Sequence, residues 1–166
     1  MRTEKTKNHK DPDQNMKNII KTILMTALCF STAFAAPNLK EKDFSGSILS
    51  SETVEFNPST FSVDGSGTGQ ATHLGQFTFT YEFEVDLLTG IGVGSAEFTA
   101  ANGDSFSTEI TAFGDPAGHV VEEHTIVGGT GRFAAASGSF TLDRLVTWTS
   151  DTSNVSVGTV DGTISY

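Results

Sequence analysis

The stretch Phe77-Thr78-Phe79-Thr80-Tyr81-Glu82-Phe83-Glu84-Val85 decides the fold class of this chain. Every odd position holds an aromatic residue or Val, and every even position holds Thr or Glu. Successive side chains of a β-strand point to opposite faces of the sheet. The stretch therefore predicts a strand with one buried face and one solvated face.

Similar alternation runs through the rest of the chain from Phe44 onward, and turn-forming residues separate the segments. Asn102-Gly103, between two alternating segments, is the strongest hairpin signal. No segment has the pattern of a long helix. The sequence predicts an all-β protein, an antiparallel meander of eight strands that closes into a barrel and so removes its exposed edges. The seven further strands are expected at 48–56, 67–74, 92–101, 105–113, 119–127, 138–149 and 155–166.

The segment Met16 to Ala35 has the three parts of an export signal. Two lysines precede an apolar stretch, and the small residues of Ala33-Phe34-Ala35 form a cleavage site. The apolar stretch is shorter than the roughly 20 residues of a membrane span. We expect Met16 to be the true start, cleavage after Ala35, and an exported protein in the periplasm or the extracellular space. The predicted domains are the extension and signal at 1–35, a flexible lead-in at 36–43 and one β-barrel at 44–166.

The composition of the predicted mature chain limits its function. Beyond Ala35 it has seventeen Asp and Glu against four Lys and Arg, a formal charge of −13. Such an acidic protein repels phosphate backbones and anionic lipids, so we expect no nucleic-acid partner and no membrane insertion of the mature chain. The single cysteine, Cys29, lies in the signal, which leaves the mature protein cysteine-free and excludes a Cys nucleophile or Cys-ligated zinc.

Gly128-Gly129-Thr130-Gly131-Arg132-Phe133 precedes a small residue and a glycine that open a long strand. Together with Ala71 to Gly75 and Ala100 to Asp104, this motif resembles the barrel shared by allene oxide cyclases and dirigent proteins, and most of all bacterial exported relatives of that group. The resemblance covers residues 65–166. The structural residues of the motif are Gly128, Gly129, Thr130, Gly131 and Phe133, whose glycines permit a tight crossover and whose Phe133 can plug one end of a barrel.

The resemblance implies an eight-stranded calycin-like barrel, often a homo-oligomer, with a pocket in its interior. In allene oxide cyclases the pocket steers a spontaneous cyclisation, and in dirigent proteins it orients radicals made elsewhere. The pocket cysteine of the cyclases has no counterpart here, and neither group's pocket residues match position by position. The specific reactions are therefore not carried over.

Polar residues within the alternating segments are the candidates for chemistry. Glu122 and His124 are two positions apart and point the same way, as an acid/base pair requires, which makes them the predicted catalytic residues. Arg144 shares a face with Phe140 and Leu142 and is predicted to anchor an anion. The predicted ligand-binding residues are Arg144, Tyr81, Glu97, Glu109 and Trp148. The alternative is that the charged residues face solvent or form an ion pair across neighbouring strands.

Neither a metal nor a cofactor is expected. On a strand His119 and Glu123 face one side and His124 the other, so the three cannot share one ion without a bulge. The glycine-rich segments around Gly67 and Gly92 open no helix and therefore do not form nucleotide loops.

Three functions follow from these observations. The first is a secreted barrel that binds a small hydrophobic or aromatic ligand in its lumen and steers the ligand's reaction. The second is a cofactor-free cyclase or isomerase that uses Glu122, His124 and Arg144. The third is a structural or protein-interaction barrel with a packed lumen. An apolar lumen of several hundred Å³ favours the first two functions, and a lumen filled with Phe favours the third.

Overall fold

A computed structural model describes residues 39–166 of the chain. They form eight strands and one short 3₁₀ helix, η1, which follows the sixth strand. The elements are β1 (Glu41–Phe56), β2 (Thr60–Ala71), β3 (Gly75–Asp86), β4 (Ile91–Ala100), β5 (Ser105–Gly114), β6 (His119–Gly129), η1 (Gly131–Phe133), β7 (Ser137–Ser150) and β8 (Ser153–Ser165). The predicted start at Met16, the signal peptide and its cleavage site lie outside the described residues. Residues 39–166 contain no helix that is long and apolar enough to cross a membrane.

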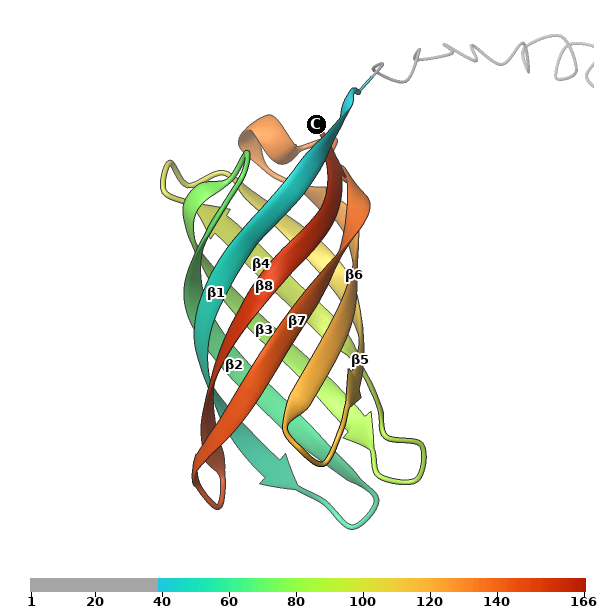
Figure 1. The fold of residues 1–166 in the computed structure, drawn as a ribbon. Helices are drawn as coiled ribbons and strands as arrows, with labels where there is room; N and C mark the ends of the chain where they lie inside the picture. Colours follow the sequence, from blue (N-terminus) through green and yellow to red (C-terminus); the bar gives the residue numbers. More distant parts are fainter. Residues whose placement is uncertain (1–38) are drawn as a thin grey trace, which may run out of the picture. The chain divides into compact units, whose positions relative to one another are not determined.

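The strands form one closed antiparallel barrel, as the sequence predicts (Figure 1). Each strand pairs with the next in the sequence, and β8 pairs back with β1 over the whole length from Glu41 to Thr53. The turns β1–β2, β3–β4, β5–β6 and β7–β8 lie at one end of the barrel, called here the open end. The opposite end carries η1 and the chain's C-terminus (Figure 1) and is called the plugged end.

The largest errors in the predicted boundaries concern the starts of two strands. β1 begins at Glu41, inside the predicted flexible lead-in, because the residues before Phe44 pair with the last residues of β8. β2 begins at Thr60 and not at 67. Its inward-facing glycines at 65, 67 and 69 hid the alternation, because a residue without a side chain gives no apolar signal.

The barrel's lumen at the plugged end is filled with aromatic rings. Phe106 lies at the centre of this cluster and contacts four other Phe rings at centroid distances from 5.0 to 6.3 Å. The rings come from strands on all sides of the barrel, so they close the interior at that end. The members of this plugged-end cluster are Phe44, Phe77, Phe79, Phe98, Phe106, Phe133 and Phe140, all at most 4% exposed.

The Gly-Gly-Thr-Gly motif builds the plug. Gly131 has φ +53°, and a Cβ there would overlap the Asp104 carboxylate, so only glycine fits the crossover. The turn of η1 then places Phe133 over the end of the lumen, where it is 1% exposed. The ring of Tyr166 packs on Phe133 at 4.9 Å, and the Lys42 ammonium lies 3.5 Å from the centre of the Tyr166 ring. Phe133 therefore plugs one end of the barrel, as predicted.

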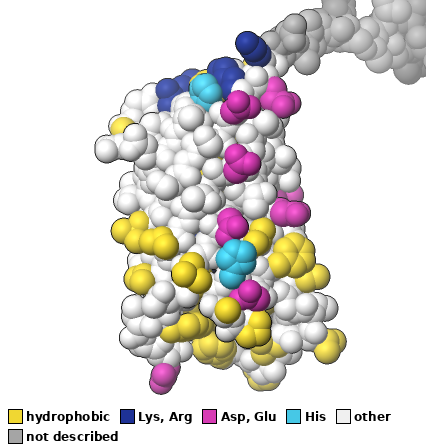
Figure 2. All heavy atoms as spheres, viewed as in Figure 1, with side chains coloured by type: hydrophobic (Ala, Val, Ile, Leu, Met, Phe, Trp, Pro, Cys, Tyr) yellow, Lys and Arg dark blue, Asp and Glu magenta, His cyan; other side chains and the backbone are white. Residues whose placement is uncertain are grey.

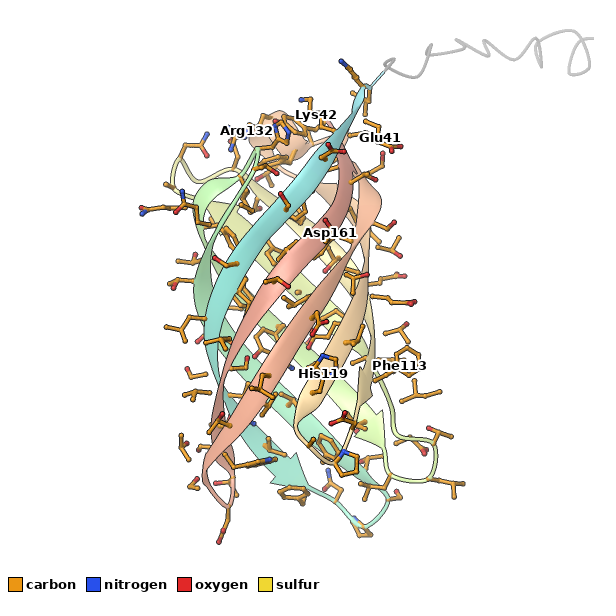
Figure 3. The ribbon with its side chains drawn as sticks, viewed as in Figure 1. Glu41, Lys42, Phe113, His119, Arg132 and Asp161 are labelled. Atoms are coloured by element: carbon orange, nitrogen blue, oxygen red, sulfur yellow. The ribbon has the colours of Figure 1, made fainter. Side chains whose placement is uncertain are left out.

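The outer surface differs between the two ends. On the face shown in Figure 2, hydrophobic side chains gather in the half toward the open end, and the Lys and Arg side chains lie at the plugged end. Lys42 and Arg132 mark that end in Figure 3. The exposed hydrophobic residues include Phe56, Leu87, Leu88, Phe113 and Trp148, which lie in or beside the turns of the open end. Apolar surface therefore surrounds the end that Phe133 does not plug.

Candidate functional site

A layer of polar side chains crosses the lumen below the plugged-end cluster. The layer forms because six strands place one or two polar residues at inward positions, on the strand face that also carries the buried apolar residues. All of its members are at most 7% exposed. The members of this polar layer are Ser50, Glu52, Tyr81, Thr108, Glu122, His124, Arg144, Asn154 and Ser156.

Arg144 of β7 is the centre of the polar layer. Its Nη1 forms an ion pair with Glu52 of β1, and its Nη2 lies 2.7 Å from Oε1 of Glu122 of β6. Nη1 also donates to the hydroxyls of Tyr81 and Ser156, each at 3.2 Å. One guanidinium thus ties together strands on opposite sides of the barrel, and its charge is shared between two carboxylates.

Glu122 and His124 lie side by side in the lumen, as predicted. Nε2 of His124 is 3.2 Å from Oε2 of Glu122, and Nδ1 is 2.9 Å from the Thr108 hydroxyl. The imidazole also stacks on Phe140 at 4.6 Å between ring centres. Both ring nitrogens of His124 are therefore engaged within the barrel, and the ring packs against the plugged-end cluster.

Tyr81 reaches across the lumen because β2 leaves room for it. Gly65 is opposite Tyr81 in the β2–β3 pairing, and a Cβ at Gly65 would overlap the tyrosine ring. The hydroxyl donates to Oε1 of Glu52 at 2.6 Å and lies 3.1 Å from the Ser50 hydroxyl. Burial raises the pKa of Tyr81 above its ordinary value, and the charge of Glu122 adds to this increase, whereas the Ser50 contact opposes it.

Three buried polar atoms of the layer have no hydrogen-bond partner among residues 39–166: Oε1 of Glu122, Nε of Arg144 and Oδ1 of Asn154. Oε1 of Glu122 still gains from its close approach to Nη2 of Arg144, although the two are not aligned for a hydrogen bond. Nε of Arg144 and Oδ1 of Asn154 have no such compensation. A buried donor and a buried acceptor without partners each destabilise the protein by about 1–3 kcal/mol.

Arg144 and Asn154 both line a cavity of about 250 Å³ in the open half of the lumen. Glu52 joins them in the lining, and most of the other lining residues are apolar. The remaining lining residues are Val54, Phe61, Val63, Phe83, Val85, Gly90, Ala112, Gly114, Asp115, Gly118, Val120, Val146 and Trp148.

A larger hollow of about 630 Å³ lies on the outer surface of the barrel. It involves Ser47, Leu49, Thr68 and Gln70, outward-facing residues of β1 and β2, and is an open surface depression.

The mouth of this cavity carries aromatic side chains. Trp148 is half exposed and stacks against Phe56 at 6.4 Å, and Phe56 contacts Phe61 at 5.8 Å. The cavity therefore has an apolar entrance, apolar walls and a polar floor.

Burial lowers the pKa of Arg144 to about 10. The guanidinium nevertheless stays charged at neutral pH, as its two carboxylate partners require.

The structure brings together some of the predicted site residues and separates others. Glu122, His124, Arg144 and Tyr81 lie in one layer, and Trp148 lies at the cavity mouth. The expectation for Glu97 and Glu109 is wrong, because both are exposed on the outer face of the barrel. Phe98 and Ile110, the residues next to them, occupy the inward positions. The lining of the cavity includes Glu52 and Arg144 but neither Glu122 nor His124.

Sequence reasoning missed five members of the polar layer: Ser50, Glu52, Thr108, Asn154 and Ser156. Strand parity was a usable signal for all five. Asn154 and Ser156 share the phase of Val160 and Ile164, which are among the most buried residues of β8. Ser50 and Glu52 share the phase of Ile48 and Val54 in β1. Thr108 likewise shares the phase of Phe106 and Ile110 in β5.

Residues 39–166 bring together no group of three His, Cys, Asp or Glu side chains suited to a metal ion. His119 projects from the outer face of β6 (Figure 3), and its Nε2 lies 2.6 Å from the Asp143 carboxylate. His124 lies on the opposite face, inside the lumen, as its position in the strand predicts.

Comparison with known proteins informs the fold. No family model matches the chain, and no curated protein matches it. Among solved structures the chain is similar to a pterocarpan synthase dirigent protein, with a TM-score of 0.52 and 14% sequence identity over 76% of this chain and 87% of that one. The match supports a dirigent-like barrel for this chain.

Proposed function

We propose that this protein is an exported, dirigent-like barrel that binds one small hydrophobic or aromatic molecule in the open half of its lumen. The bound molecule is oriented by the polar floor, and its reaction is steered without a covalent bond to the protein. The observation that carries the proposal is the cavity of about 250 Å³, with apolar walls and the polar side chains of Glu52, Arg144 and Asn154 at its floor. Ligand sites in proteins commonly combine apolar walls with a few convergent polar groups.

The plugged end supports the same proposal by contrast. A structural barrel with no ligand gains stability by filling its whole lumen, as Phe106 and its neighbours do here in one half. In the open half the inward residues are mostly Val, Gly and Ala, which leave space. Space maintained in one half of an otherwise tightly packed interior is typical of a binding site.

A cyclase or isomerase is the second candidate. Its specific support is that the cavity presents a carboxylate, Glu52, beside a guanidinium, Arg144. The predicted acid/base pair of Glu122 and His124 would then act one step away from the ligand, through Arg144.

Native mass spectrometry of the protein purified from its own host tests the proposal. We expect a retained molecule of defined mass, which would also reveal the oligomeric state. The Val120→Phe variant should lose this molecule, because Val120 lines the cavity. Val121→Phe is the matched control, since Val121 is the adjacent residue on the outer face of β6.

Three outcomes separate the candidate functions. If the unaltered protein and both variants each have the mass of the polypeptide alone, with no bound molecule, the structural barrel with no lumen ligand is favoured. A retained molecule that the protein converts to an isomer of the same mass, with turnover lost in Glu52→Gln, would favour the enzyme. A retained molecule that is released unchanged supports the binding barrel.

A further inference from the structure

The balance of charge in the polar layer limits what the cavity can bind. Glu52 and Glu122 contribute two carboxylates, and Arg144 contributes one guanidinium. His124 adds at most one further positive charge, so the layer carries a net charge of −1 or zero. A carboxylate ligand would bring a third anion into a buried site whose cation is already shared between two. Binding of an anion is therefore unfavourable, in contrast to the anion anchor that the sequence suggests for Arg144.

The hydrogen-bond inventory defines what the cavity does accept. Nη1 of Arg144 contacts Glu52, Tyr81 and Ser156, and Nη2 forms an ion pair with Glu122, whereas Nε is a buried donor without a partner. A guanidinium can only donate, so the complementary ligand atom is an acceptor. Oδ1 of Asn154, another residue of the lining, is a buried acceptor without a partner. A hydroxyl group matches this pair of atoms, because it accepts one hydrogen bond and donates another.

The walls define the rest of the ligand. Val54, Val63, Val85 and Phe83 surround the space above the polar floor, and Trp148 lies at the mouth. A volume of about 250 Å³ is slightly below the roughly 300–1,000 Å³ of pockets for drug-sized ligands. The cavity is large enough for a molecule with a single ring or with two fused rings.

We infer that the cavity takes an uncharged, compact apolar molecule with a hydroxyl group, which it discriminates from the corresponding carboxylate. The hydroxyl group lies on the polar floor, where it accepts from Nε of Arg144, and the ring body extends toward Trp148. This inference rests on the proposed lumen binding and adds the ligand class and its orientation.

Three probes with one ring system test the inference by NMR titration at pH 7: 2-naphthalenemethanol, naphthalene and 2-naphthoate. We expect the alcohol to bind at least about 10-fold more tightly than either of the others. We also expect the alcohol to shift the Nε–Hε signal of Arg144. The sequence has only Arg2, Arg132 and Arg144, so the arginine region is simple and Arg144→Lys assigns the signal.

A charge variant tests the reason for the discrimination. Glu52→Gln removes one negative charge from the floor and keeps an oxygen that can accept from Tyr81. We expect the affinity for 2-naphthoate to rise at least about 10-fold relative to the affinity for the alcohol. Glu55→Gln is the matched control, because Glu55 lies on the exposed outer face of the same strand and carries the same charge. If Glu52→Gln does not fold, Glu122→Gln makes the same charge change at the other carboxylate.

Two results would overturn the inference while leaving lumen binding intact. One is 2-naphthoate binding to the unaltered protein as tightly as the alcohol does. The other is binding of 2-naphthalenemethanol with no shift of the Nε–Hε signal of Arg144. A folded protein that binds none of the three probes would instead remove the proposed function, and the inference with it.

Discussion

The two halves of the lumen use the same strands for different purposes. Toward the plugged end the inward positions hold large aromatic residues, and Phe106 is fully buried among four other rings. Toward the open end the inward positions hold smaller residues such as Val63 and Ala112, and they surround a cavity. The polar layer around Arg144 separates the two halves. The comparison shows that one barrel can concentrate its packing stability at one end and leave the other end free to bind.

The polar layer has a role in this division. Glu52, Tyr81 and Arg144 belong to β1, β3 and β7, and their contacts span the interior just below the aromatic cluster. A buried network whose members are mostly satisfied fixes the positions of its side chains. The floor of the cavity is therefore held rigid by groups that do not themselves line it, such as His124 and Ser156.

The largest expected effect comes from a matched pair of Phe→Ala changes in the two halves. Phe106→Ala should lower the free energy of unfolding by about 3–5 kcal/mol, because it leaves a void inside a packed cluster. Phe83→Ala should lower it by about 2 kcal/mol, mainly the loss of buried apolar area, because Phe83 already borders a cavity. Urea unfolding monitored by circular dichroism measures the free energy of unfolding of both variants. Equal losses would contradict the division into a packed half and an open half.

Removal of the central cation should be nearly as damaging. Arg144→Met leaves Glu52 and Glu122 buried without their ion-pair partner, and we expect a loss of about 3 kcal/mol in urea unfolding. Adding Glu52→Gln and Glu122→Gln to this variant should restore most of the stability, because no unpaired charge remains. A triple variant as unstable as Arg144→Met would show that packing of the arginine, and not its charge, stabilises the layer.

The third prediction concerns the titration of Tyr81. The chain has two tyrosines, so Tyr166→Phe leaves Tyr81 as the only one. Because burial raises the pKa of Tyr81 well above its ordinary value of about 10, no tyrosinate absorbance should appear near pH 10 while the protein is folded. The absorbance should then appear together with the loss of the circular dichroism signal. Tyrosinate that forms near pH 10 in the folded variant would mean that the floor is open to water.

The smallest expected effect lies in a turn of the open end. Asp86 accepts from the backbone N–H groups of Leu88 and Thr89 and from the Thr89 hydroxyl, and these bonds, those of Thr89 first, lower the pKa of its carboxyl. The ionised form is thus favoured by folding. The ionised carboxylate of Asp86 therefore stabilises the folded protein at pH values above its ordinary pKa of about 4. This stabilisation is lost as the pH falls through the lowered pKa.

Asp86→Asn should therefore lower Tm slightly at pH 7, and the difference from the unaltered protein should disappear near pH 2. Thermal unfolding at both pH values measures this. Asp64→Asn is the control for the change of net charge, since Asp64 is an exposed residue of β2. A Tm difference that persists at pH 2 would assign the effect to the turn's shape and not to the carboxylate.

Much of the fold and part of the site could be predicted from the sequence. Alternation alone locates most of the strands, and Arg144 shares its phase with Phe140 and Leu142, which places its side chain in the lumen. The same reasoning would have placed Glu97 outside, next to the inward Phe98. It would also have placed Glu52 in the lumen, because Glu52 shares its phase with Ile48 and Val54.

The sequence by itself determined that this chain is a barrel of antiparallel strands, because a period of two is a local property that each strand carries alone. It also determined the plug, since the Gly-Gly-Thr-Gly-Arg-Phe motif is continuous along the chain. Only the tertiary structure decided which polar residues meet. Tyr81 and Arg144 are 63 positions apart, and closure of the barrel brings them to one guanidinium-centred layer. Likewise, the volume of the cavity depends on the sizes of side chains from several strands, so no single segment of the sequence determines it.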